Sequence, residues 1–451
     1  MRQYIKKQCL ATLDTLNEAH EDIASIFKAG NMGATMGLLE QCQQGAISIG
    51  EVIEEHEGEG TKAVRLLEKY CERVYELYGQ IERGETVNIR QAVRQFRGML
   101  DKVTNELNNT IPTQREVVFL PYKASMWDSL ESMWRISKDD KGTTAVVVPI
   151  PYYDKNPDGS FREIHYEIDL FPADVPVVRY DRYDLAKRHP DTVIIHNPYD
   201  ECNYVTSVDP MFYTKELKKH TDELIYIPYF ILGDIDPYDP DALMGVKHFV
   251  LTPGVIHADR VIVESEDMKK VYVDILTAHS SSKLRKQWEQ KISGLGSPKV
   301  ERVINLRYED FDMPESWEKL IYTEDGTKKK VILYNTSVNA AIKYGADMLA
   351  KIRRSLCIFK KYEGKIVLIW RPHPLTEATI KAMYPGLWDG YHEVIDGYRN
   401  AGWGIYDDSP DMHMAIAVSD AYYGDESSVA WLYKKTGKPI MIQECNRKGD
   451  L

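Results

Sequence analysis

The sequence predicts an α/β protein in which two Rossmann-like, doubly wound domains follow an all-helical N-terminal region. Three features of its 451 residues lead to this prediction. The first stretch has the apolar spacing of helices, two later stretches alternate short β-branched runs with helices, and a Gly-rich segment near residue 295 separates those two. Alternation of strands and helices is typical of parallel sheets covered on both faces. We expect domains at 1–112, 113–294 and 295–451.

Narrow apolar seams mark the helical region. In 61–83 and again in 88–109, apolar residues recur at alternating spacings of three and four. This pattern predicts two helices packed as an antiparallel hairpin, and residues 3–28 and 34–55 predict two further helices. A helical layer packed on the rest of the chain is the simpler interpretation. A homo-oligomer or a partner docked through this region is the alternative.

Short apolar runs predict the strands of both sheets, because runs without polar alternation suit strands that are buried on both faces. The first domain has five such runs, at 117–120, 145–149, 192–195, 224–227 and 258–263. The second domain has five more, at 330–334, 366–370, 403–406, 421–423 and 438–442. Ligands of such sheets bind at the carboxyl ends of the strands. We therefore expect a site in a cleft between the two domains.

Composition excludes several classes of function. The formal net charge is −12, from 69 acidic and 57 basic residues, whereas a general nucleic-acid binder needs a basic surface. No apolar run approaches the length of a membrane span, and the first residues lack the apolar core of a signal peptide. The six cysteines are scattered without metal-ligand spacing, which favours reduced core thiols in a cytoplasmic protein. We assign no metal ligands and no cofactor.

The sequence Arg371-Pro372-His373-Pro374 follows one predicted strand of the second domain. The two prolines fix the backbone on either side of the imidazole. Arg371 could bind phosphate oxygens through two hydrogen bonds. His373 titrates near neutral pH and could protonate or stabilise a leaving phosphate. The alternative is a histidine whose ring is satisfied by a neighbouring carbonyl.

Hydroxyl residues precede two predicted helices of the same domain. Asp425, Ser427 and Ser428 lie before one helix, and Thr336 and Ser337 before another. A helix N-terminus offers unpaired N–H groups and a positive dipole end, which attract phosphate. Ordinary N-capping would account for the serines as well, but the repeated strand-loop-helix context favours phosphate binding. With the Arg-His loop, these residues predict one site that grips an anionic donor from two sides.

The first domain should supply the base that deprotonates an acceptor hydroxyl. His196 follows a predicted strand and is the first candidate, and His257 is the second.

The second domain resembles the CDP-glycerol glycerophosphotransferase family, whose enzymes build or prime teichoic-acid-type poly(glycerol phosphate) chains. Over roughly 250–445 the family's motifs occur in order, as Gly296-Ser297-Pro298-Lys299, Arg371-Pro372-His373-Pro374, Ser419-Asp420, Gly424-Asp425-Glu426-Ser427-Ser428 and Lys438-Pro439-Ile440. The resemblance implies a GT-B fold and transfer of glycerol phosphate from CDP-glycerol to a polyol or glycan acceptor, with release of CMP. By this resemblance His373 assists at the donor phosphate, Ser427 and Ser428 bind it, and Lys299 belongs to the donor-binding set.

Two other functions stay open at this point. The same fold could use a nucleotide sugar as a glycosyltransferase, or it could be a degenerate, non-catalytic GT-B protein that acts through its helical arm. The implied role in cell-surface polymer synthesis also leaves open a peripheral association with the inner face of the membrane.

Overall fold

The computed structural model describes residues 1–156, 158–374, 376–409 and 411–443. Its N-terminal part is built from four long helices, α1 (Gln3–Lys28), α2 (Met32–Glu57), α3 (Lys62–Glu82) and α4 (Ile89–Asn109). Each helix contacts the next, and α1 also contacts α4, so the four close into a bundle. The two predicted seams are buried on α3 and α4. The predicted hairpin is therefore one half of a four-helix bundle.

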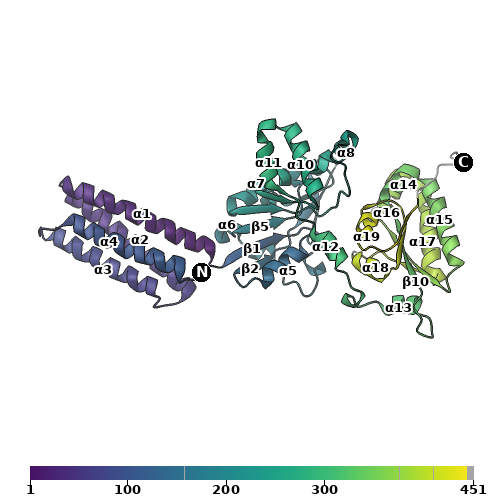
Figure 1. Ribbon diagram of the computed structural model, residues 1–451, viewed down its shortest axis with the longest axis horizontal. Helices are drawn as coiled ribbons and strands as arrows, with labels where there is room; N and C mark the ends of the chain where they lie inside the picture. The colour runs from purple at the N-terminus through teal and green to yellow at the C-terminus, as the bar shows by residue number, and fades with distance from the viewer. Residues whose placement is uncertain (157, 375, 410, 444–451) are drawn as a thin grey trace.

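The bundle meets the first sheet by one end and otherwise extends away from it (Figure 1). Arg2, just before α1, forms an ion pair with the buried Glu116 of the first strand. The ring of Tyr4 stacks on His189, with centroids 4.1 Å apart. The helices thus form a separate arm and do not cover the sheets as a layer.

The first sheet has six parallel strands in the order β2-β1-β5-β7-β8-β9. They are β1 (Arg115–Leu120), β2 (Thr143–Val147), β5 (Thr192–Ile195), β7 (Glu223–Tyr226), β8 (Arg260–Ile262) and β9 (Ile292–Ser293). The first five overlap the five predicted runs, and β9 was not predicted. The α-helices of this part are α5 (Glu131–Asp139), α6 (Leu185–Arg188), α7 (Thr214–Leu217), α8 (Pro240–Val250), α9 (Pro253–His257), α10 (Glu266–His279) and α11 (Arg285–Lys291).

A small antiparallel sheet, which the sequence did not predict, is inserted into the first domain. It has the order β4-β3-β6, with β3 (Tyr152–Lys155), β4 (Phe161–His165) and β6 (Thr206–Val208). Its strands are short, and β4 is largely exposed. They therefore lack the apolar runs that revealed the parallel strands.

The second sheet has five parallel strands in the order β12-β11-β10-β13-β14. They are β10 (Lys330–Thr336), β11 (Ile366–Pro372), β12 (Ile405–Tyr406), β13 (Ala421–Gly424) and β14 (Ile440–Ile442), and each overlaps a predicted run. The helices are α12 (Pro298–Ile304), α13 (Glu315–Ile321), α14 (Val338–Tyr344), α15 (Ala346–Lys360), α16 (Thr376–Met383), α17 (Trp388–Ala401), α18 (His413–Val418) and α19 (Ser428–Lys434). The helical stretch after β10 is divided between α14 and α15 at Gly345, whose φ of 47° interrupts the helical backbone.

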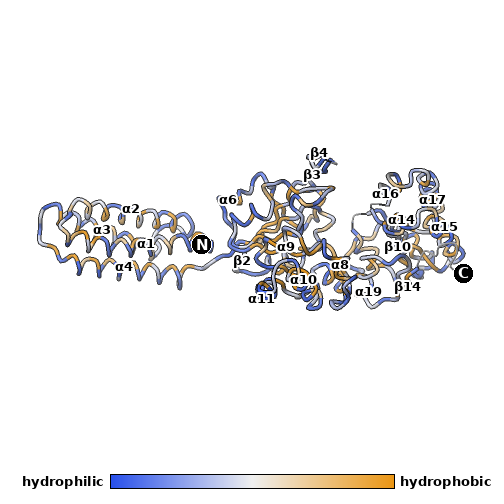
Figure 2. The backbone as a smooth tube through the Cα atoms, turned by 90° about the horizontal axis from the view of Figure 1, so that it is seen from above, coloured by the Kyte–Doolittle hydropathy of each residue, from blue (hydrophilic) through white to orange (hydrophobic). Residues whose placement is uncertain are grey.

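The predicted fold class is confirmed: an all-helical region precedes a GT-B-like pair of doubly wound parallel sheets. Figure 1 shows helices on both faces of each sheet, and Figure 2 shows apolar segments gathered along the strands of the first domain. Among the described residues, no helix is both long and apolar enough to cross a membrane.

The cysteines fit the expectation of core thiols only in part. Cys9 and Cys42 are buried, Cys71 is partly buried, and Cys202 and Cys357 are exposed. The sixth, Cys445, lies outside the described residues.

Candidate functional site

The two loops singled out in the sequence lie at the same edge of the second sheet. Strand β10 separates β11 from β13, so the carboxyl ends of these strands are two strand spacings apart, roughly 10 Å. The N–H of His373 donates to the Thr336 carbonyl at 2.9 Å, and the N–H of Asp425 donates to the Asn335 carbonyl at 3.1 Å. Both loops are therefore anchored on the last residues of β10.

The buried side chain of Asn335 joins the two loops directly. Its Nδ2 donates to the carbonyl of Arg371 at 2.9 Å. Its Oδ1 accepts hydrogen bonds from the hydroxyls of Ser427 at 3.0 Å and Tyr422 at 3.3 Å. Asn335 is not among the site residues that the sequence predicted. In the sequence, the one feature that could have indicated that Asn335 joins the two loops is its amide side chain at the end of a predicted strand.

Arg371 is buried and bound within the protein. Its Nη1 lies 2.5 Å from Oδ2 of Asp407, and its Nη2 donates to the Ser409 carbonyl at 2.8 Å. The guanidinium thus holds the loop that follows β12. Arg371 also lines the cavity that contains His373, so its contact with a donor phosphate stays a prediction.

His373 lines a cavity of about 350 Å³ at the carboxyl ends of β11 and β12. Trp388, Arg399 and Asp408 contribute to the same cavity. Burial, and after it the positive charge of Arg371, lower the pKa of His373 below its usual 6.5. The imidazole is therefore mainly neutral at pH 7, which favours hydrogen-bond donation or proton acceptance over the role of an acid in the ligand-free protein.

A larger cavity, of about 920 Å³, lies between the two domains. Glu426, Ser427 and Ser428 line it from the start of α19, and residues 231–235, which follow β7 of the first sheet, line it from the other side. The structure thus confirms a hollow between the carboxyl edges of the two sheets. His373 lines the smaller cavity and the serines line the larger one, so the two halves of the predicted grip lie at neighbouring cavities on one edge of the second sheet.

Several predicted phosphate ligands are committed to local contacts. Ser427 caps α19 by accepting the N–H of Ala430 at 3.2 Å, and Ser337 caps α14 by accepting that of Ala340 at 3.2 Å. The hydroxyl of Thr336 accepts a hydrogen bond from the Trp370 indole at 3.2 Å. Ser428 is exposed at the first position of α19. Of the two serines, Ser428 is thus the more accessible to a ligand.

Asp425 is buried and supports the loop after β10. Its Oδ2 accepts the N–H of Ser337 at 2.6 Å, and its Oδ1 pairs with Nζ of the buried Lys351. The carboxylate is therefore neutralised inside the domain. This arrangement makes it a positioning residue and not a direct ligand of an anion.

Lys299 belongs to a buried network that joins the two domains. Its Nζ lies 3.2 Å from Oδ2 of Asp128, which follows β1 in the first domain. Nε2 of His413, the first residue of α18 in the second domain, lies 3.0 Å from the same oxygen. Burial alone would raise the pKa of the Asp128 carboxyl, but Lys299 and His413 outweigh it and lower the pKa to about 2. Lys299 thus ties the domains together, and it is not among the residues that line the larger cavity.

Neither histidine predicted as the acceptor-side base is placed for that role. His196 is fully buried: its Nε2 accepts the N–H of Tyr122 at 3.1 Å, and its Nδ1 lies 2.9 Å from the Ser129 hydroxyl. Burial, above all, lowers the pKa of His196 to about 3. His257 ends α9 just before β8 begins, so it lies at the amino edge of the first sheet, away from the cavity. The sequence revealed neither that His196 is buried nor that His257 lies at the amino edge of the sheet.

Glu264 is a titratable residue beside the loop that lines the larger cavity, and it was not selected from the sequence. It follows β8 at the carboxyl edge and accepts the N–H of Leu232, a residue that lines the larger cavity, at 3.0 Å. Its side chain is partly exposed. Burial raises the pKa of Glu264 to about 7, in spite of the backbone N–H groups of Leu232 and Gly233, which lower it.

No family model matches the sequence, and no curated protein matches it. Among solved structures, it is similar to the UDP-GlcNAc 2-epimerase from Neisseria meningitidis bound to UDP-GlcNAc, with 10% identity, coverage of 72% of this chain and 82% of that chain, and a TM-score of 0.40. It is also similar to the wall teichoic acid polymerase TagF, with 15% identity, coverage of 85% and 79%, and a TM-score of 0.37. Similarity at this level says nothing about activity.

Proposed function

We propose that the protein is a transferase that moves glycerol phosphate, or a related alditol phosphate, from a CDP-linked donor to a hydroxyl acceptor in the synthesis of a cell-surface polymer. The observation that carries the proposal is the cavity between the domains, which brings Ser427 and Ser428 opposite the loop 231–235. The ordered motifs shared with the CDP-glycerol glycerophosphotransferase family support the choice of donor.

The larger cavity suits a nucleotide diphosphate in size and chemistry. Its volume of about 920 Å³ is in the range of small-molecule sites, which run from roughly 300 to 1,000 Å³. Trp431 offers an aromatic face, Lys434 a cation and Ser428 a hydroxyl beside the N–H groups that begin α19. Aromatic contact for the base and a cation with hydroxyls for the phosphates are the groups that such a ligand requires.

In the proposed reaction an acceptor oxygen attacks the β-phosphorus of the donor, which bears the glycerol. The new P–O bond forms as the bond to the CMP oxygen breaks, and CMP leaves with the electron pair. The hydroxyl proton passes to a base on the acceptor side. Preorganised donors that stabilise the charge on the phosphoryl oxygens supply much of the rate in such reactions.

We assign the acceptor-side base to Glu264 in place of His196. It lies at the carboxyl edge of the first sheet, directly behind the loop that lines the cavity. A general base works best when its pKa lies near the working pH, and that of Glu264 is about 7. His373 lines the neighbouring smaller cavity, so in this proposal the donor extends from the larger cavity past the end of β10, and the neutral imidazole donates a hydrogen bond to the transferred phosphate.

A screen of donors monitored by nucleotide release tests the proposal. The full chain is incubated with CDP-glycerol, CDP-ribitol and UDP-N-acetylglucosamine, each with glycerol phosphate oligomers as acceptor. We expect CMP release from a CDP-linked donor that depends on the acceptor. Release of UDP from the sugar donor alone would show a glycosyltransferase instead, and the absence of any turnover and binding would support a non-catalytic protein.

A further inference from the structure

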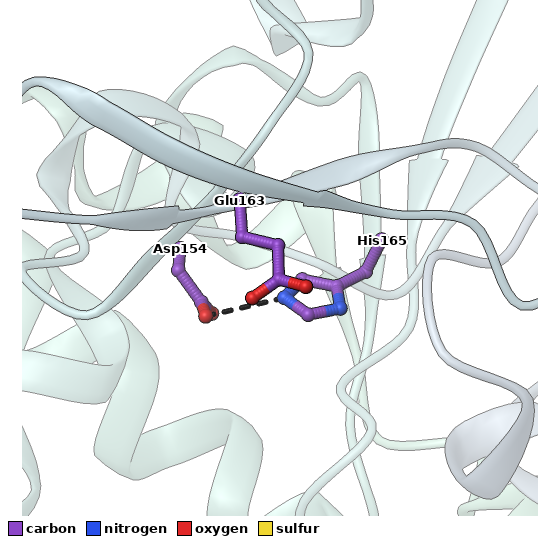
Figure 3. Close-up of side chains that lie close together, drawn as sticks. All are labelled: Asp154, Glu163 and His165. Atoms are coloured by element: carbon purple, nitrogen blue, oxygen red, sulfur yellow. Dashed lines mark ion pairs between the residues drawn. The ribbon is translucent and has the colours of Figure 1, made fainter.

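The β3–β4 hairpin of the inserted sheet carries a cluster of three side chains with metal-ligand chemistry. Asp154 lies on β3, and Glu163 and His165 lie two residues apart on β4, so the latter two share a face of the strand. Figure 3 shows the three side chains converging. One ligand atom from each lies within 4.8 Å of the other two. Among the residues that the structure describes, this is the one such group of three or more.

We propose that Asp154, Glu163 and His165 bind a divalent transition-metal ion of the Zn²⁺ or Mn²⁺ class. An imidazole nitrogen with two carboxylates suits these ions, whereas Mg²⁺ and Ca²⁺ prefer oxygen ligands alone. Three protein ligands would leave at least one coordination position for water or another ligand. The site lies apart from the cavities of the proposed transferase site.

The neighbours of His165 hold its ring in a ligating orientation. The imidazole stacks on Tyr152, with centroids 4.9 Å apart and planes 23° from parallel. Tyr152 in turn donates its hydroxyl hydrogen to Glu167 at 2.7 Å, which fixes the tyrosine. With the ring held this way, Nε2 of His165 lies 3.1 Å from Oδ2 of Asp154.

This spacing is close to what a bound ion needs. Zinc–ligand bonds of about 2.1 Å in a tetrahedron place the ligand atoms roughly 3.4 Å apart. Asp154 and His165 are already near that separation. Glu163 is exposed, so its side chain can rotate to complete the set without a change in the backbone.

The guanidinium of Arg162 would compete with a bound ion for the carboxylate of Asp154. This group donates to Oδ2 of Asp154 at 2.9 Å and so occupies one of the oxygens that would bind the ion. A bound cation must displace this contact and would be repelled by the nearby positive charge. Removal of the guanidinium should therefore strengthen metal binding, which a purely structural role for the cluster would not cause.

A bound ion would fasten the free end of the hairpin. β3 pairs with both β4 and β6, while β4 is an edge strand and is largely exposed. Figure 2 places the hairpin at the outside of the first domain. Cross-linking the two strands through metal bonds would favour the folded hairpin by mass action.

Titration of the reduced, metal-stripped full chain with CoCl₂ and ZnCl₂ tests the proposal. We expect one Co²⁺ per chain with visible d–d absorption, displaced by Zn²⁺ and without the thiolate charge-transfer band that Cys202 or Cys357 would produce. H165Q and E163Q should each weaken binding at least tenfold, and R162Q should strengthen it several-fold. The matched control is H392Q, which removes another exposed His–Asp pair, His392 with Asp396 at 3.3 Å, and should leave binding unchanged.

Three results would overturn the assignment. They are binding below one equivalent per chain at micromolar metal, binding that survives H165Q and E163Q, or binding that H392Q weakens as much as H165Q does. An increase in affinity with R162Q cannot come from misfolding, because an unfolded variant would not gain a specific site, so this result supports the assignment independently of the losses.

Discussion

His373 is presented to the smaller cavity by its backbone, which is fixed between two prolines and hydrogen-bonded to the end of β10. Its lowered pKa keeps the ring neutral at pH 7. The proposed contact with the donor phosphate therefore rests on a hydrogen bond from a neutral imidazole, and a bound phosphate would raise the pKa toward its usual value.

Replacement of His373 by alanine should lower kcat with CDP-glycerol by roughly a hundredfold, the typical contribution of a positioned proton donor or acceptor. The measurement is CMP release at saturating donor. His279→Ala, an exposed histidine at the end of α10, is the control and should keep wild-type turnover. Wild-type turnover in His373→Ala would remove this residue from the reaction.

The raised pKa of Glu264 predicts how the rate depends on pH. A base must be deprotonated to act, so kcat/KM should rise as pH increases through about 7, the pKa of Glu264 in the folded protein. In Glu264→Gln the rate should fall and this rise should disappear. If Glu264 serves only to hold the loop at Leu232, the variant will lose stability but will retain the same dependence on pH.

At the scale of elements, the loops that follow β11 and β13 meet at the carboxyl end of β10, which lies between these two strands. Gly424, the last residue of β13, approaches the Asn335 carbonyl so closely that a Cβ would collide with it, and its φ of 145° disfavours other residues. The sequence showed this glycine only as part of a motif. The close approach explains why a residue without a side chain is needed there.

Gly424→Ala should therefore destabilise the second domain by at least about 2 kcal/mol, since both a backbone clash and an unfavourable φ arise. Gly364→Ala, in a surface turn where an added Cβ meets no atom within 4 Å, should change stability by less than about 0.5 kcal/mol. Urea unfolding followed by tryptophan fluorescence compares the two. Equal effects would contradict the structural account of the β10–β13 junction.

Strands that bury apolar residues on both faces could be predicted from the sequence. Strands with an exposed face could not. The runs 117–120 and 366–370 coincide with central strands because every residue in them faces a covered side. β3 and β4 are short, partly exposed and antiparallel, so no apolar run marks them. The split between α14 and α15 depends on a positive φ at Gly345, which an apolar pattern cannot reveal.

The candidate site was predictable only in outline, for a related reason. Motifs placed His373 and the serines at strand ends, because the order of strands and loops can be read from local sequence. Asp128 and His413 are 285 residues apart, so their contact follows from the packing of the domains and not from any local pattern. His196 has the sequence position of a site residue but is covered by packing.

At the scale of the whole molecule, Asp128 connects the two domains that enclose the larger cavity. Its carboxylate is shared by Lys299 and His413. Loss of one partner leaves a buried charge uncompensated, which typically lowers the free energy of unfolding by about 3 to 5 kcal/mol. The relative position of the domains, and with it the width of the cavity, should depend on this residue.

Asp128→Asn should accordingly lower the thermal unfolding temperature and increase the radius of gyration measured by small-angle X-ray scattering. Asp139→Asn, an exposed aspartate on α5, should do neither. Unchanged scattering and unfolding in Asp128→Asn would show that the network does not hold the domains together.

The central claim is that a CDP-linked donor binds in the larger cavity with its phosphates at the start of α19, and calorimetric titration with CDP-glycerol tests it most directly. We expect wild-type protein to bind CDP-glycerol in preference to UDP sugars, and Ser428→Ala to bind it about tenfold more weakly or worse, since a hydrogen bond to a charged group contributes roughly 1.5 to 3 kcal/mol. The exposed Ser316→Ala in α13 should match the wild type. Absence of binding, or equal affinity in wild type and Ser428→Ala, would contradict the account.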